Sequence, residues 1–225
     1  MTAASPAKMQ NADSSLTDRA YRILEEMFVT MKLDPGSVLS EIALAERLGI
    51  GRTPIREALQ RLSREGLITI LPRKGILVTE INPAKQLRLL EVRRALERLM
   101  AQSGSRRSTA EEREAFLEIA SGMEAAAREN DDLLFMRQDD ALNRLVSKAA
   151  RNEYASRAMA LLHSLSRRFW YMHYKESADL PLCARLHADL ARKIASGDSE
   201  AAADASDRLI QYVETFTKAT ITERI

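Results

Sequence analysis

The segment GRTPIREALQRL, residues 51–62, decides the fold of the first third of the chain. Its apolar residues recur at three- and four-residue steps, which is the period of an amphipathic helix. At ~100° per residue, one arc of this helix carries Ile55, Ala58, Leu59 and Leu62. The neighbouring arc is polar and carries Arg52, Arg56, Gln60 and Ser63. The segment therefore predicts a short helix with one buried face and one basic face.

Another short helix is predicted just before this segment, in LSEIALAERLGI, residues 39–50. Ser40 can cap its start, and Gly49 supplies the left-handed residue that ends it. The spacing predicts that its buried face contains Ile42, Ala43, Ala45 and Leu48. In the following helix, Thr53 is the expected N-cap, and Pro54 would take the first helical position, where no N–H is needed. The pattern indicates two short helices joined by a glycine-containing turn.

The segments on either side complete a small domain. Upstream, apolar residues at helical steps from Ala20 to Met31 predict a helix from residue 17, which the turn sequence DPG, residues 34–36, would end. Downstream, LITILPRKGILVTEI, residues 67–81, places aliphatic and β-branched residues on both sides of PRKG. This pattern predicts a β-hairpin with a basic loop, directly after the second short helix.

The rest of the chain divides into a tail and a second domain. Residues 1–14 are small and polar with no helical or strand period, so we expect a disordered tail. NPAK, residues 82–85, ends the last strand and opens a new helix, which gives domains of residues 15–82 and 83–225. The second domain is helical in period, with breaks near residues 103–109, 129–132, 177–181 and 196–198. The predicted fold class is mainly α: a winged helix–turn–helix with a small β-hairpin, followed by an antiparallel bundle of six or seven helices.

Composition excludes several classes of protein. The chain has 34 Lys and Arg against 32 Asp and Glu, so any contact with a polyanion must be local. Cys183 is the only cysteine, which excludes an intramolecular disulfide and favours a reducing compartment. No apolar run approaches the ~18 residues that span a bilayer, so we expect a cytoplasmic protein without a membrane partner. The sequence has no phosphate-binding glycine loop, HExxH or GxSxG motif, so we predict that the protein is not an enzyme.

Positive charge is concentrated around the helix of residues 52–62. Between Arg52 and Lys74 there are six basic and two acidic residues, a local net charge of +4. Arginine near the start of such a helix can pair with guanine in the major groove, and the Thr53 hydroxyl beside the helix terminus suits a phosphate. The basic loop of the hairpin can reach the adjacent minor groove. These features predict binding to double-stranded DNA; the alternative is a helical protein-interaction scaffold whose winged helix binds protein.

Residues 39–81, LSEIALAERLGIGRTPIREALQRLSREGLITILPRKGILVTEI, resemble the winged helix–turn–helix of GntR-family bacterial transcription regulators. The match runs through most of residues 17–81 and implies base contacts from Arg52 and Arg56. With the polar arc of the helix, the predicted DNA-binding residues are Arg52, Thr53, Arg56, Gln60, Arg73, Lys74 and Gly75. Where some members carry a DNA-contacting arginine or lysine, this chain has Ile42. Because one such module contacts few bases, we expect a homodimer on an imperfect palindrome.

The helical half resembles the all-α ligand-sensing (FCD) domain of the FadR-like branch of this family, over about residues 84–220, beginning with LLEVRRALERLMAQ. The resemblance implies a divalent metal held by one Asp and three His. Asp139 and His187 match two of these ligands, whereas Asn143 and Leu209 stand where the other two histidines are usual. Asp139, Asn143 and His187 would form a weak, open metal shell, so a divalent metal is possible but direct ligand contacts are favoured. We expect a ligand pocket that contains Arg93, Asp139, Asn143 and His187.

The segment HSLSRRFWYMHYKE, residues 163–176, permits two interpretations. Its histidines and aromatic side chains, with Arg167 or Arg168, would suit an organic anion in a cavity. Aromatic residues at helical spacing are more often core or dimer interface, and we favour that interpretation. The prediction for the whole chain is a ligand-responsive transcription regulator, with repression the favoured sign. Its effector is expected to be a small metabolite, an organic acid with a carboxylate.

Overall fold

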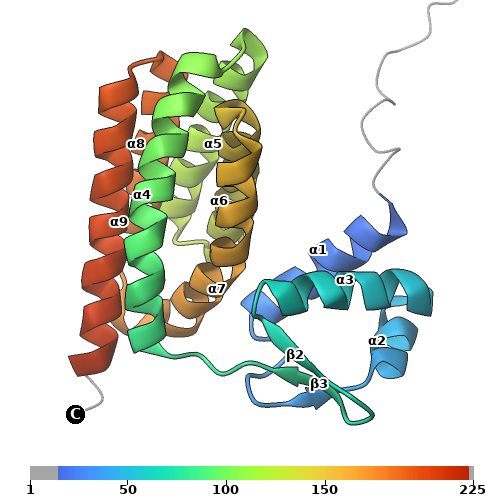
Figure 1. Ribbon diagram of the computed structural model, residues 1–225. Coiled ribbons are helices and arrows are strands. Elements are labelled where there is room, and N and C mark those ends of the chain that lie inside the picture. The colour runs from blue at the N-terminus through green and yellow to red at the C-terminus, as the bar shows by residue number, and fades with distance from the viewer. Residues whose placement is uncertain (1–14, 223–225) are drawn as a thin grey trace, which may run out of the picture. The chain divides into compact units, whose positions relative to one another are not determined.

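The computed structural model describes residues 15–222 and divides into two compact units, one through Glu80 and one from Ile81 (Figure 1). The division lies within two residues of the boundary predicted at residue 82. The predicted tail, residues 1–14, lies outside the described residues. None of the helices within residues 15–222 is long and apolar enough to cross a membrane.

The N-terminal unit is a winged helix–turn–helix, as predicted. Its helices are α1 (Leu16–Val29), α2 (Glu41–Leu48) and α3 (Arg52–Arg64), and its strands are β1 (Val38–Leu39), β2 (Ile68–Leu71) and β3 (Gly75–Val78). The predicted hairpin is formed by β2 and β3, which pair antiparallel with Ile70 opposite Ile76. The strand β1 was not predicted, because two residues carry no usable period. It pairs with β3, so the sheet order is β1-β3-β2.

The core of this unit lies between α1 and α3, which pack against each other. The apolar arc predicted for α3 is buried, since Ile55, Ala58, Leu59 and Leu62 all have almost no exposed surface. From α1, Ala20, Leu24 and Phe28 are fully buried. The structure therefore confirms the buried face of α3 that the helical period of the sequence predicted.

Three local predictions for this unit were wrong. The buried face of α2 consists of Leu44 and Ala45, whereas Ile42 is 50% exposed and Ala43 is exposed. Helix α2 has only eight residues, so few of its side chains can be buried. Its contact with α3 decides which of them are buried, and the periodic pattern does not. Helix α3 begins at Arg52 with Gly51 as its N-cap, so Thr53 lies inside the first turn and does not cap, and Pro54 is the third helical residue, not the first. Helix α1 ends at Val29, before the DPG turn, where Met31 takes a left-handed backbone conformation.

The C-terminal unit is a helical bundle, and within the described residues it contains six helices, in agreement with the prediction. They are α4 (Pro83–Arg107), α5 (Ala110–Glu129), α6 (Asp132–Ala150), α7 (Glu153–Ser177), α8 (Leu180–Ser196) and α9 (Ser199–Thr222). The most extensive packing joins α5 to α8 and α4 to α9 (Figure 1). The turn between α6 and α7 was not predicted. There Arg151 adopts a left-handed conformation and the Asn152 side chain caps α7.

Candidate functional site

The polar arc of α3 presents its arginines to solvent. The side chains of Arg52 and Arg56 are 61% and 55% exposed, and Gln60 is exposed one turn further along. Both arginines face Glu41 at the start of α2: Arg56 donates from Nε at 3.0 Å and from Nη2 at 2.8 Å, and Arg52 Nε lies at 3.5 Å. The hydrogen bond from Arg56 holds the pKa of Glu41 below its usual value, against the opposing effect of burial. Glu41 therefore gathers the two guanidinium groups at one place.

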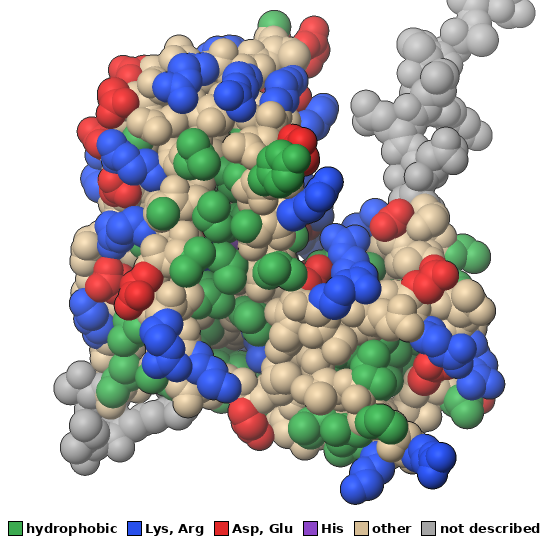
Figure 2. Space-filling model, viewed as in Figure 1, with side chains coloured by type: hydrophobic (Ala, Val, Ile, Leu, Met, Phe, Trp, Pro, Cys, Tyr) green, Lys and Arg blue, Asp and Glu red, His purple; other side chains and the backbone are tan. Residues whose placement is uncertain are grey.

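A groove of about 300 Å³ runs between α3 and the β2–β3 hairpin. Four of the predicted DNA-binding residues line it: Arg56, Gln60, Arg73 and Gly75. Arg52, Thr53 and Lys74 are exposed and do not line it. Figure 2 shows basic side chains over the tip of the hairpin and over the end of the unit where α2 and α3 meet. The helix and the wing thus present positive charge at two separate places on the same unit.

The wing turn depends on Gly75. This residue has φ +109°, and a Cβ at its position would lie 2.6 Å from the backbone oxygen of Leu39 in β1. Any side chain would therefore collide with the neighbouring strand as well as strain the backbone. Arg73, two residues earlier, also takes a positive φ, of 61°. The loop that carries the basic residues is consequently held in a tight, defined conformation.

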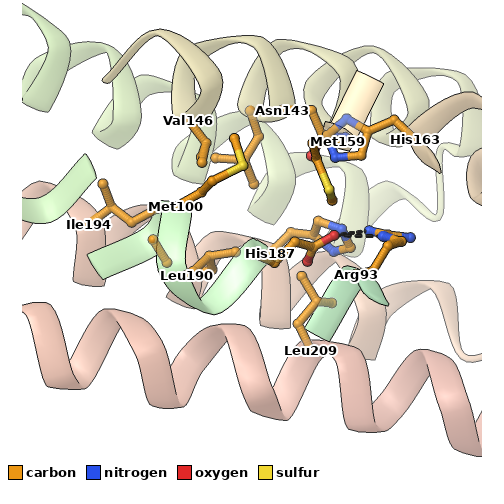
Figure 3. A pocket seen from close by; sticks show the side chains of 13 residues that line it. Arg93, Met100, Asn143, Val146, Met159, His163, His187, Leu190, Ile194 and Leu209 are labelled. Atoms are coloured by element: carbon orange, nitrogen blue, oxygen red, sulfur yellow. Dashed lines mark hydrogen bonds and ion pairs between the residues drawn. The ribbon is translucent and has the colours of Figure 1, made fainter. Parts of the chain in front are cut away.

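The C-terminal unit encloses a cavity in the middle of the bundle (Figure 3). It is lined from five helices by Arg93, Glu97, Met100, Ala101, Leu142, Asn143, Val146, Met159, His163, His187, Leu190, Ile194 and Leu209. Figure 3 shows Arg93, His163 and His187 together at one end, and Met100, Val146, Leu190 and Ile194 around the other. The cavity offers about 20 Å³ to the centres of water molecules, which is room for one or two. It has a polar end and an apolar end, and it is small as it stands.

The predicted pocket residues are brought together at the polar end, with one difference. Arg93, Asn143 and His187 line the cavity, whereas Asp139 is buried beside them and does not line it. Asp139 Oδ1 accepts a hydrogen bond from Asn143 Nδ2 at 3.1 Å and lies 3.4 Å from His187 Nε2. Its other oxygen, Oδ2, lies 2.9 Å from Nε of Arg167. The carboxylate is therefore enclosed by partners on both oxygens.

Burial and neighbouring charges set the protonation states at this end. Burial raises the pKa of Asp139, but the hydrogen bond with His187 and the charge of Arg167 outweigh it, so the net shift is downward. Burial lowers the pKa of His187, but Cys183 and Asp139 more than compensate, and the pKa lies well above its usual value. Burial and the Arg93 cation lower the pKa of His163 to about 3, so this ring is neutral near pH 7.

Arg93 has two side-chain partners, of which sequence reasoning missed Ser166. Its Nε donates to Glu97 Oε1 at 2.6 Å, one turn along α4, and its Nη1 donates to Ser166 Oγ at 2.5 Å. Ser166 also accepts from Gln86 Nε2 at 2.6 Å, which fixes the hydroxyl between α4 and α7. The four-residue spacing of Arg93 and Glu97 was a usable signal, whereas the contact with Ser166 joins residues 73 positions apart.

The aromatic segment of α7 is mainly core, in the sense that we favoured from the sequence. Trp170 and Tyr174 are buried and stacked with ring centroids 4.6 Å apart, and Trp170 also contacts Phe135. His173 is buried against Phe169. His163 differs from these residues, because it lines the cavity. From α7, His163 and Met159 therefore line the cavity, while the aromatic residues pack in the core.

The residues at the positions implied for a metal fit one poorly. Among residues 15–222, no group of three or more His, Cys, Asp or Glu side chains is arranged to hold a metal ion. Leu209 is buried and supplies no donor atom, and Asn143 uses its amide nitrogen toward Asp139. The Arg167 guanidinium lies against the carboxylate that a metal would require. A divalent cation at Asp139 would therefore have to compete with a fixed positive charge.

Comparison with known proteins identifies the two units. Residues 16–78 match the model of the bacterial regulatory proteins of the gntR family, and residues 88–212 match the model of the FCD domain. Together these matches define a class: a DNA-binding transcription regulator with a ligand-binding C-terminal domain. The chain belongs to the GntR family and carries a C-terminal FCD domain.

Individual relatives agree with this assignment. A 78-residue segment, 35% of this chain, is 41% identical to an uncharacterized HTH-type transcriptional regulator in the TAR-I ttuE-ttuC' intergenic region of Agrobacterium vitis. That match spans 46% of the relative, less than half its length. Over 205 residues, 90% of this chain and 89% of the relative, the chain is 27% identical to the HTH-type transcriptional repressor RspR of Escherichia coli strain K12. The structure of E. coli McbR/YncC covers 93% of this chain and 100% of its own with a TM-score of 0.78; at 19% identity this shows likeness of fold alone.

Proposed function

We propose that the protein is a repressor that binds an imperfect palindrome as a homodimer and is controlled by a small organic acid. The observation that carries the proposal is the shared groove of α3 and the wing, where Arg56, Gln60 and Arg73 line one surface opposite the buried arc of α3. A helix with exposed arginines and a basic hairpin beside it suit major-groove base contacts flanked by phosphate or minor-groove contacts.

The composition of the cavity supports an organic anion with an apolar body as effector. Its polar end contains Arg93, which pairs with Glu97, and the imidazoles of His163 and His187, and its other end is apolar. A carboxylate can accept hydrogen bonds from a guanidinium and an imidazole, while an apolar chain would pack on Val146 and Leu190. Because the cavity has room for only one or two water molecules, a metabolite must displace side chains to enter.

That displacement gives a route to regulation. A ligand changes DNA affinity only if it binds one arrangement of the protein better than another. An effector that opens the cavity would favour one arrangement of the helices around it, with a coupling of roughly 1–3 kcal/mol sufficient for a useful switch. Exposed apolar side chains on α4, among them Val92 and Leu99, support self-association of the C-terminal unit.

The test begins with selection from a randomised oligonucleotide pool at moderate salt, followed by affinity measurements on the selected duplex. Arg56→Ala should weaken binding by roughly 5- to 150-fold and relax the preference at one position of each half-site. Lys74→Ala should weaken binding to all duplexes alike and reduce the slope of log affinity against log salt by about 1. Equal behaviour of the two variants would contradict the assignment of base reading to α3.

The alternative, a scaffold whose winged helix binds protein, makes a different prediction for the same selection. It predicts no enrichment of any sequence and no salt-dependent affinity for duplex DNA. Light scattering on the native protein, with and without the selected duplex, measures the molecular mass and so tests for a homodimer independently. A monomer that binds a single half-site with full affinity would overturn the proposed palindrome.

A further inference from the structure

The buried ion pair of Asp139 and Arg167 is a feature that DNA binding does not require. Asp139 projects from α6 and Arg167 from α7, and their side chains are only 10% and 12% exposed. Arg167 Nη2 also donates to the backbone oxygen of Met136 at 3.0 Å. Its Nη1 lies 3.8 Å from Asp140 Oδ1, so the guanidinium is held by three groups of α6.

His187 completes this arrangement from α8. Its Nδ1 lies 2.8 Å from the backbone oxygen of Cys183, its Nε2 faces Asp139 at 3.4 Å, and its ring meets Phe135 edge-on. Both nitrogens are thus assigned to fixed partners. His187 also lines the cavity, whereas Asp139 and Arg167 do not.

A divalent metal and this guanidinium would serve the same electrostatic purpose. Each places positive charge against a buried carboxylate that would otherwise be strongly disfavoured in the bundle interior. A divalent ion bound to Asp139 would be repelled at short range by the Arg167 guanidinium, which already lies against this carboxylate. The remaining ligand positions are weak, since Leu209 has no donor and the Asn143 amide nitrogen points to Asp139.

We propose that Arg167 is the resident cation of the effector pocket: it neutralises Asp139, fixes His187 through that carboxylate, and keeps a divalent metal out. An effector is then bound by side chains directly, with no bridging ion. This inference rests on the proposed function only in taking the cavity as the effector site. The role of Arg167 in excluding metal is measured without DNA and without effector, so either proposal can fail alone.

The test restores the missing imidazoles and then varies the cation. Asn143→His with Leu209→His supplies two further nitrogen donors beside Asp139 and His187. The same double variant is then combined with Arg167→Gln, which removes the charge, or with Arg167→Lys, which retains it. Equilibrium dialysis and visible absorption of Co²⁺ report affinity and coordination for all four proteins, including the native chain.

The native chain should hold no stoichiometric Co²⁺ after dialysis, and the double variant should bind it weakly. Adding Arg167→Gln should tighten Co²⁺ binding by about 10-fold or more, because it removes a fixed positive charge from beside the carboxylate that would bind the metal. Adding Arg167→Lys should leave the affinity of the double variant unchanged. Stoichiometric Co²⁺ on the native chain, or equal affinities of the Gln and Lys variants, would overturn the proposal.

Folding is monitored separately for each protein by helical circular dichroism. If the Gln variant is unfolded in the absence of metal, refolding it in Co²⁺ answers the same question. A ligand that binds only the folded state restores folding, so helicity should return with Co²⁺ for the Gln variant and not for the Lys variant. If Co²⁺ restored the helicity of both the Gln and the Lys variants, or of neither variant, this result would contradict the role assigned to Arg167.

Discussion

The two units of the molecule use charged side chains in opposite ways. In the winged helix, Arg52, Arg56 and Glu41 pair at the surface, where solvent screens them and the arginines remain within reach of another molecule. In the bundle, Asp139 and Arg167 pair in the interior, where neither is within such reach. Surface pairs contribute little to stability but can exchange partners, whereas buried pairs have strict geometric and energetic requirements. The first pair lies on a surface that another molecule can contact, whereas the second is a fixed ion pair behind the residues that line the cavity.

The largest effect is expected from removing one member of the buried pair. Arg167→Met should lower the free energy of unfolding by about 3–5 kcal/mol, because buried Asp139 would lose the cation that pairs with its Oδ2 and would keep partners on Oδ1 alone. The matched control is Arg144→Met, which breaks an exposed pair with Asp140 on the same helix as Asp139 and should change stability by less than about 1 kcal/mol. Urea unfolding followed by circular dichroism measures both. Similar losses would show that burial does not distinguish the two pairs.

The next effect concerns the core beneath the basic arc of α3. Ile55→Ala should destabilise the N-terminal unit by about 2–5 kcal/mol, since Ile55 is fully buried between α3 and α1. Ile42→Ala is the control of identical chemistry on a half-exposed side chain and should cost no more than about 0.5 kcal/mol. Thermal unfolding reports the comparison. A large loss at Ile42 would restore the packing role that we first expected for it.

Glu112 lies between the two extremes, because it is buried but its partners are more exposed. It closes a capping box with Thr109 at the start of α5 and pairs with Arg151 at 2.9 Å and Lys148 at 3.5 Å. Burial raises the pKa of Glu112, but the Thr109 N–H and the Arg151 and Lys148 cations outweigh it, so the net shift is downward. A lowered folded-state pKa stabilises above the ordinary Glu value of about 4.3 and loses that contribution as the pH falls through the folded value. Glu112→Gln keeps a side chain that can cap the helix but removes the titrating carboxyl. In urea unfolding between pH 7 and pH 3, the free energy of unfolding of this variant should fall less steeply than that of the native chain. An identical fall would exclude Glu112 as a source of the pH dependence.

The smallest effect is expected at Glu41, the surface carboxylate that gathers Arg52 and Arg56. Glu41→Gln removes one negative charge beside a basic face and releases both guanidinium groups. Affinity for random-sequence duplexes should therefore rise a few-fold, and the ratio of selected to random affinity should fall. Fluorescence anisotropy at two salt concentrations measures this change. A fall in affinity for the selected duplex alone would instead show that Glu41 positions Arg56 for base contact.

Periodicity predicted the architecture well because the buried arc of α3 and the six helices of the bundle each extend over several turns. It failed where a few residues decide the outcome: the packing face of α2, the start of α3 and the two-residue strand β1 depend on tertiary contacts. In the pocket, Arg93, Asn143 and His187 were predicted through family resemblance and do line the cavity. The partners Ser166 and Arg167 were not assigned, since pairing across helices far apart in the chain leaves no local pattern.

The short strand β1 affects the distance between the two parts of the N-terminal unit that are proposed to contact DNA. By pairing with β3, Val38 and Leu39 join the wing to the residues that lead directly into α2, and Gly75 keeps the two backbones at closest approach. This pairing ties the hairpin to the start of α2, and it therefore restrains the separation between α3 and the tip of the hairpin. Under the proposed function, we expect the number of base pairs between the helix contact and the wing contact to vary little from one DNA site to another.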